Sequence, residues 1–140
     1  MTSDRSHKPP TDGPRFPDVL LLSQISNEMV RAQKRYFGRG PTQAKSYLLD
    51  DFLLVVMRGG MTTAESTMLE CGREGLVRGF RQELENALAE RLIERLQELT
   101  GRTIVSHQAQ ILFNPNVVVD LFFFEPEIAG IASRSPAETE

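Results

Sequence analysis

Three parts of the sequence carry residue types that could do chemistry: the adjacent carboxylates Asp50 and Asp51, the strand-like segment around His107, and the single cysteine, Cys71. Paired carboxylates can bind a cation or act as acid and base, a histidine can bind zinc, and a thiolate is a nucleophile when a helix N-terminus or a cation such as Arg73 favours its charged form. Each candidate lacks the partners that its chemistry needs: a third oxygen ligand, a second histidine or cysteine at metal-ligand spacing, or a histidine base. The sequence therefore predicts no catalytic residue, no metal site and no bound cofactor, and we expect the protein not to be an enzyme.

Ordinary structural roles account for the same residues. Aspartate tolerates the backbone angles of a turn and bonds to its own neighbours, so Asp50 and Asp51 are predicted to form a turn between two strands. His107 is predicted to be a partly exposed strand residue, and Cys71 a half-buried thiol without reactivity.

A group of cations around the end of the first predicted helix is the candidate binding surface. The chain has no acidic residue between Glu28 and Asp50, and two aromatic residues, Tyr36 and Phe37, lie among the cations of this segment. The cations are Arg31, Lys34, Arg35, Arg39 and Lys45. Because cations at a helix C-terminus complement its dipole, part of the pattern is structural. The functional interpretation is a partner- or anion-binding surface, although the net charge of −3 argues against nucleic acid.

Hydrophobic periodicity and turn signals predict the elements that position these residues. We expect helices over about 18–37, about 63–70 and 72–101, and strands over 43–49, 52–58, 102–113 and 117–124. Asp18 is the expected N-cap of the first helix, and Thr62 and Glu65 are expected to form a capping box at the start of the second. Short connections make each strand pair antiparallel, and a lone hairpin is marginally stable. The predicted fold is therefore α+β, with both hairpins in one four-stranded sheet and the helices packed on one face.

The long predicted helix carries an apolar stripe that shifts along its length. Phe80 and Leu84 lie on one line of the helix, and Arg91 and Arg95 occupy the same line further on. A straight helix with this line buried would bury two arginines, so we expect a kink or break near Glu90. The alternative is one curved helix whose arginines extend to solvent.

The composition of the chain ends predicts the limits of the domain, and the single cysteine indicates its cellular compartment. Residues 1–17 and 126–140 are polar or rich in proline and small residues, so we expect disordered tails around a domain at 18–125. One cysteine suits a reducing compartment, the first residues lack the apolar core of a signal peptide, and no apolar run approaches the roughly 18 residues that span a bilayer. We expect a cytoplasmic protein.

Several of these landmarks, taken in order, resemble the MpsC family of bacterial proteins, named for the third component of a sodium-translocating, membrane-potential-generating system. The matching segments lie within about residues 20–125 and are Gly38-Arg39-Gly40-Pro41, SYLLDDFLLVVMRGG followed by Met61-Thr62-Thr63-Ala64-Glu65, Gly72-Arg73-Glu74-Gly75-Leu76-Val77, and Leu92-Ile93-Glu94 leading to Leu99-Thr100-Gly101. The chain differs from the family in having Glu90 where a proline is frequent, and Asn114-Pro115-Asn116 where an acidic turn is frequent. The resemblance implies a protein without a membrane span or an established catalytic residue, associated with a system whose integral subunits move ions.

The residues and the resemblance together favour a non-enzymatic, cytosolic accessory or regulatory protein. The segment 117–124 is apolar on both faces of a strand, which is more than an ordered domain of roughly 105 residues covers easily. We therefore expect a homodimer that docks on another protein, membrane-associated in the family's context, with Arg35 and Arg39 in the contact. The alternative is a small nucleic-acid- or anion-binding protein that uses the basic segment 31–45, and its binding would weaken steeply with salt.

Overall fold

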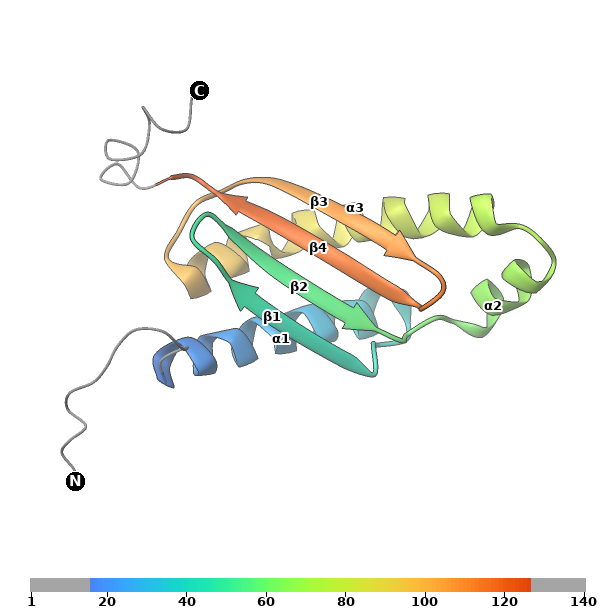
Figure 1. Cartoon of the computed structure of the whole chain (residues 1–140), viewed down its shortest axis with the longest axis horizontal. Coiled ribbons are helices and arrows are strands. Elements are labelled where there is room, and N and C mark those ends of the chain that lie inside the picture. The colour runs from blue at the N-terminus through green and yellow to red at the C-terminus, as the bar shows by residue number, and fades with distance from the viewer. Residues whose placement is uncertain (1–15, 127–140) are drawn as a thin grey trace.

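The computed structural model describes residues 16–126 of the chain (Figure 1). Of the two predicted tails, residues 1–15 and 127–140 lie outside this range. The elements are α1 (Phe16–Phe37), β1 (Gln43–Leu48), β2 (Phe52–Arg58), α2 (Thr63–Glu70), α3 (Glu74–Thr100), β3 (Ile104–Leu112) and β4 (Val117–Phe124). This order confirms the predicted α+β class and the predicted sequence of helices and hairpins.

The four strands form one antiparallel sheet in the order β1-β2-β4-β3. Asp50 and Asp51 form the predicted turn between β1 and β2, because the backbones of Leu49 and Phe52 exchange hydrogen bonds of 2.8 and 3.3 Å across it. β2 and β4 pair directly, with Phe52 opposite Phe123 at one end of the ladder. This pairing joins the two hairpins, as expected, and it gives the strand order that the sequence left open.

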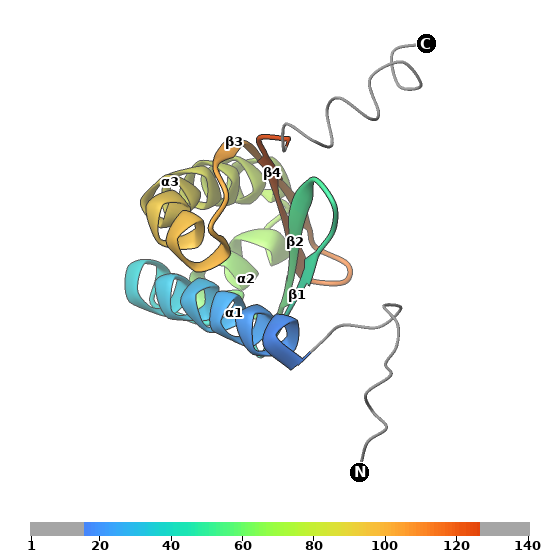
Figure 2. The same ribbon diagram turned by 90° about the vertical axis from the view of Figure 1, so that its left-hand side faces the viewer.

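All of the described helices lie on the same side of the sheet (Figure 2). α1 contacts β1, and α3 contacts both α1 and β3. Because successive side chains of a strand point to opposite faces, every second residue of β2 and β4 enters the core beneath these helices. The buried core includes Ile25, Met29, Leu53, Val55, Met57, Leu92, Leu96, Val118 and Phe122. The predicted packing of the helices on one face is confirmed.

The expected break near Glu90 is wrong, because α3 is one continuous helix of 27 residues. The expectation assumed that the line through Phe80 and Leu84 faces the core. Phe80 is instead 56% exposed, so Arg91 and Arg95 continue an exposed line and a straight path buries neither of them. The buried residues of α3 are Val77, Arg81, Glu85, Leu88, Ala89, Leu92 and Leu96.

The helix starts agree with the sequence in one case and differ in another. Thr62 caps α2 by accepting a hydrogen bond from the backbone N–H of Glu65, and the Glu65 carboxylate accepts one from the backbone N–H of Thr62, which confirms the capping box. α1 begins at Phe16, so Asp18 lies inside its first turn and is not its N-cap.

Candidate functional site

The residues that the sequence singled out for chemistry are dispersed over the fold. Asp50 and Asp51 lie at the β1–β2 turn, and Cys71 is exposed after α2 rather than half-buried as expected. His107 lies in β3 and contacts the carboxylate of Asp120 in β4. Within residues 16–126, no three His, Cys, Asp or Glu side chains are arranged to hold a metal ion.

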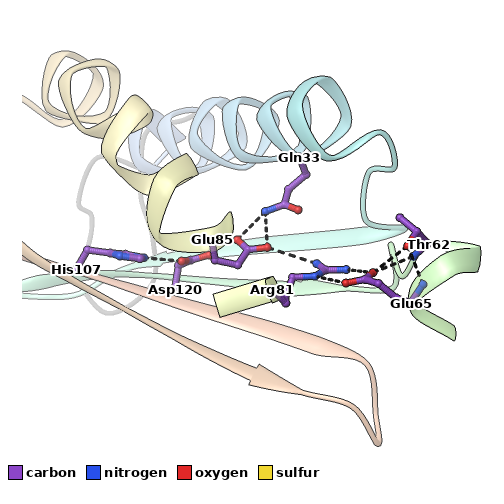
Figure 3. A network of polar contacts seen from close by, with 7 residues as sticks. All are labelled: Gln33, Thr62, Glu65, Arg81, Glu85, His107 and Asp120. Carbon is purple, nitrogen blue, oxygen red and sulfur yellow. Dashed lines mark hydrogen bonds and ion pairs between the residues drawn. The ribbon is translucent and has the colours of Figure 1, made fainter. Parts of the chain in front are cut away.

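The structure instead places a set of charged side chains between the helices and the sheet, with Arg81 of α3 at its centre (Figure 3). The Arg81 guanidinium donates two hydrogen bonds to the carboxylate of Glu65, at 2.7 and 3.0 Å, and contacts the carboxylate of Glu85 at 3.4 Å. It also stacks over the Phe37 ring, 4.0 Å from its centroid. All three charged side chains are at most 7% exposed. These contacts tie α2 and the end of α1 to α3.

Glu85 connects this set to α1, and Asp120 of β4 lies beside Glu85 without a hydrogen bond to it (Figure 3). The amide nitrogen of Gln33 donates to both Glu85 oxygens, at 2.7 and 2.9 Å. Asp120 contacts His107 through one carboxylate oxygen at 2.6 Å, while its other oxygen is buried without a hydrogen-bond partner. We refer to these buried polar side chains as the buried ion network, and its members are Gln33, Glu65, Arg81, Glu85, His107 and Asp120.

The buried ion network was not predicted from the sequence, although the sequence contains a signal for it. Leu92 and Leu96 are buried, and stepping back along the same side of a continuous helix leads to Leu88, then Glu85 and Arg81. These two residues are four apart and opposite in charge, a pair that faces one side of a helix. The expected break gives each half of the helix its own apolar face, and it predicts no buried role for Arg81 and Glu85.

Burial sets the protonation of the two inner carboxyl groups. Removal from water, together with the nearby charge of Asp120, raises the pKa of Glu85 from its ordinary 4.5 to about 7. Burial also raises the pKa of Asp120, against the opposing effect of its contact with His107. The network holds three carboxyl groups around one guanidinium, so a proton on Glu85 reduces its excess of negative charge.

The sheet has an uncovered apolar side, which we call the outer face. Leu53, Val55 and Phe122 are buried under the helices, so their strand neighbours point the opposite way, where no described helix lies. The outer face is formed by the half-buried residues Phe52, Leu54, Val56, Val119, Leu121 and Phe123, with Tyr47 and Leu112 more exposed beside them. Rings of Phe52 and Phe123 pack at 5.7 Å.

A second apolar surface lies among the three helices. It is a groove of about 580 Å³, lined chiefly by Tyr36 and Phe37 at the end of α1, Met68 of α2, and Leu76 and Phe80 of α3. Leu76 is 62% exposed and Phe80 56%, so these large side chains project along one wall. Glu65 also lines the groove, and Arg81 fixes the positions of Phe37 and α2 by stacking on the first and binding Glu65 of the second.

The five predicted binding cations do not share one surface. Arg31, Lys34 and Arg35 are exposed on α1, and Arg31 pairs with Glu28 at 3.2 Å. Arg39 is exposed in the connection after α1, whereas Lys45 projects from the outer face beside Tyr47. Ser46 faces α1, because its hydroxyl hydrogen-bonds to Ser26 of that helix. Successive side chains of a strand point to opposite faces, so the adjacent Lys45 points away from the helices.

Two arginines of α3 join the α1 cations instead. Arg91 stacks over the Tyr36 ring at 4.8 Å, and Arg35 stacks over the same ring at 5.0 Å. Arg95 contacts Glu28 at 3.3 Å and so lies beside Arg31. The sequence could not group these residues because α1 and α3 are far apart in the chain.

The fold and these surfaces define a class: an α+β domain with a helical layer on one face of a four-stranded antiparallel sheet, and a buried ion network between the layers. The chain belongs to the MpsC family, described as the Na⁺-translocating membrane potential-generating system (MpsC), whose sequence profile matches residues 20–126. This confirms the resemblance seen in the sequence.

The chain is also similar to a bacterial protein of related sequence. The chain is 30% identical over 94 residues to an uncharacterized protein, YbcI, of Bacillus subtilis (strain 168), covering 65% of this chain and 74% of the relative. No solved structure gives a significant match. In the part of the chain that the structure describes, no helix is both long and apolar enough to cross a bilayer.

The raised pKa of Glu85 predicts a stability that falls as the pH rises. The folded state holds a proton that the unfolded state releases at about pH 4.5, so the free energy of unfolding should fall by about 3 kcal/mol between about pH 4.5 and pH 8 from this group. Glu85→Gln mimics the protonated acid and should remove most of this slope. Urea unfolding followed by circular dichroism at several pH values measures it. Glu83→Gln, at an exposed position of the same helix, should keep the wild-type slope; an unchanged slope in Glu85→Gln would contradict the assignment.

Removal of the central cation should be strongly destabilising. Arg81→Met leaves Glu65 and Glu85 buried without their cation, which costs about 3–5 kcal/mol for a buried ion pair. The urea midpoint should fall accordingly, and the loss should be smaller at acid pH, where Glu85 is protonated. Arg95→Met, which breaks only exposed pairs, is the matched control and should leave the midpoint nearly unchanged. Equal midpoints for the two variants would show that the network does not hold the fold.

Proposed function

We propose that this protein is a non-catalytic accessory protein that forms a homodimer through the outer face of its sheet and docks on a further protein. The observation that carries the proposal is the outer face itself, a continuous apolar surface at the centre of the sheet that none of the described helices covers. Contiguous apolar surface on a folded chain indicates association. The name of the family, a Na⁺-translocating membrane potential-generating system, supports a partner in a membrane-associated assembly.

The charges around the outer face support a second copy as its occupant. Exposed Arg58 and Lys45 lie toward one end of the strands, whereas exposed Asp50 and Glu125 lie at the other. A two-fold axis that lies in the interface and runs perpendicular to the strands would place the basic end of each copy against the acidic end of its partner. Such an interface is isologous, with apolar residues at the centre and complementary charges at the rim, which is the usual arrangement in homodimers.

The docking role is supported by the cations of the helical side. Arg35 and Arg39 are exposed at and beyond the C-terminal end of α1, and α1 lies on the side of the sheet that a dimer through the outer face leaves free. Lys45 belongs to the outer face and would take part in the dimer. The nucleic-acid alternative rested on all five cations acting together, and their division between two faces favours the docking role.

A charge on the outer face should separate the dimer. Leu121 lies opposite Leu54 at the centre of the face, and Leu121→Lys should raise the dissociation constant at least about a hundredfold, equivalent to about 2.7 kcal/mol. Light scattering coupled to size exclusion measures the mass of the wild type and the variant over a range of concentrations. Ser23→Lys, at an exposed position of α1, is the control and should remain dimeric. A wild-type protein that stays monomeric up to submillimolar concentration would refute the dimer.

A further inference from the structure

The groove between α1, α2 and α3 is apolar along its walls and charged at one end. Tyr36 and Phe37 of α1 and Leu76 and Phe80 of α3 line the groove, and the rings of Phe37 and Phe80 pack against each other at 6.4 Å where the two helices meet. Leu76, Phe80 and Leu84 follow one another at intervals of four residues, about 6 Å apart along the helix, so they form a straight apolar row. Half-buried Met68 of α2 also lines the groove, and its flexible side chain can adapt to another surface.

Two guanidinium groups mark the Tyr36 end of the groove. Arg35 and Arg91 approach the Tyr36 ring from α1 and α3, at 5.0 and 4.8 Å from its centroid. The ion pairs found among residues 16–126 are made by other arginines, so both positive charges are available to an acidic group. Two cations beside an apolar channel are complementary to an acidic and apolar ligand.

We propose that this groove binds an amphipathic helix of a partner protein, with apolar side chains along the groove and an acidic residue at the end that meets Arg35 and Arg91. A helix fits because the walls are themselves helices, and the apolar row on α3 matches side chains at positions i, i+4 and i+7 of a second helix. This inference specifies the partner chemistry of the proposed docking role and rests on that role, but not on the dimer.

The buried ion network prepares the groove for its ligand. Arg81 stacks under Phe37 on one side and holds Glu65 of α2 on the other, so both flanks of the groove are fixed to α3 before any partner arrives. A preformed groove avoids the entropy of ordering its walls on binding. The groove is lined by residues of α1, α2 and α3. These helices lie on one side of the sheet and the outer face is on the other (Figure 2), so the two contacts can form independently.

Two synthetic helical peptides provide the test. Both have leucines at positions i, i+4 and i+7, and they differ only in carrying glutamates or lysines at one end. Calorimetry with the full chain should show binding of the acidic peptide and at least about tenfold weaker binding of the basic one. Amide NMR shifts on titration should centre on Met68, Leu76 and Phe80. Absence of acidic-peptide binding, or equal binding of both peptides, would overturn the proposal.

Matched variants locate the contact. Leu76→Ser with Phe80→Ser should weaken acidic-peptide binding at least about tenfold, whereas Val105→Ser, a similarly exposed apolar residue on β3, should not change it. Arg35→Glu with Arg91→Glu should weaken binding and reduce its salt dependence, and Arg95→Glu should do neither. An equal effect of Val105→Ser would overturn the proposal, as would flotation of the chain with anionic vesicles in place of peptide binding. If the peptide fails while Leu121→Lys still separates the dimer, the groove proposal falls and the dimer remains.

Discussion

A buried arginine needs its charge balanced within reach of its side chain, and Arg81 imposes this requirement on most of the fold. Glu65 from α2 and Glu85 from α3 supply the balancing carboxylates, and Gln33 of α1 completes the hydrogen bonds of Glu85. Since a buried charge without its partner is strongly unfavourable, these elements have to pack in one relative arrangement. Asp120 brings β4 into the same electrostatic environment, as the raised pKa of Glu85 shows.

The inward position of Arg81 and Glu85 leaves apolar side chains on the exposed side of α3. These side chains are Leu76 and Phe80, which line the groove. The outer face of the sheet has a similar origin, because β2 and β4 are apolar on both faces while the helices cover only one. The chain is therefore held together partly by polar contacts and is apolar where it can meet other molecules. Both proposed contacts follow from this distribution.

The sequence predicted the local elements well, because their signals are local. The apolar strand 52–58, the capping box of Thr62 and Glu65, and the Asp50-Asp51 turn each depend on residues close together in the chain. The buried ion network depends on contacts between residues as far apart as Gln33 and Glu85, and charged side chains are normally assigned to solvent. The expected break near Glu90 was wrong for a related reason. It assumed that the apolar side chains of Phe80 and Leu84 face the core, whereas the buried side of α3 carries Arg81 and Glu85. Strand order likewise depends on the pairing of β2 with β4, which no local signal encodes.

The most direct test of this account is the titration of Glu85 itself. Its side-chain carboxyl carbon can be followed by NMR in the folded protein over a pH series, with the exposed Glu83 as an internal reference. Burial and the nearby charge of Asp120, which outweigh the opposing effects of Arg81 and Gln33, raise the pKa of this carboxyl, so it should titrate at about 7. A midpoint near the ordinary 4.5 would mean that water reaches the space between α1, α3 and the sheet, and it would contradict the network on which the packing of the helices depends.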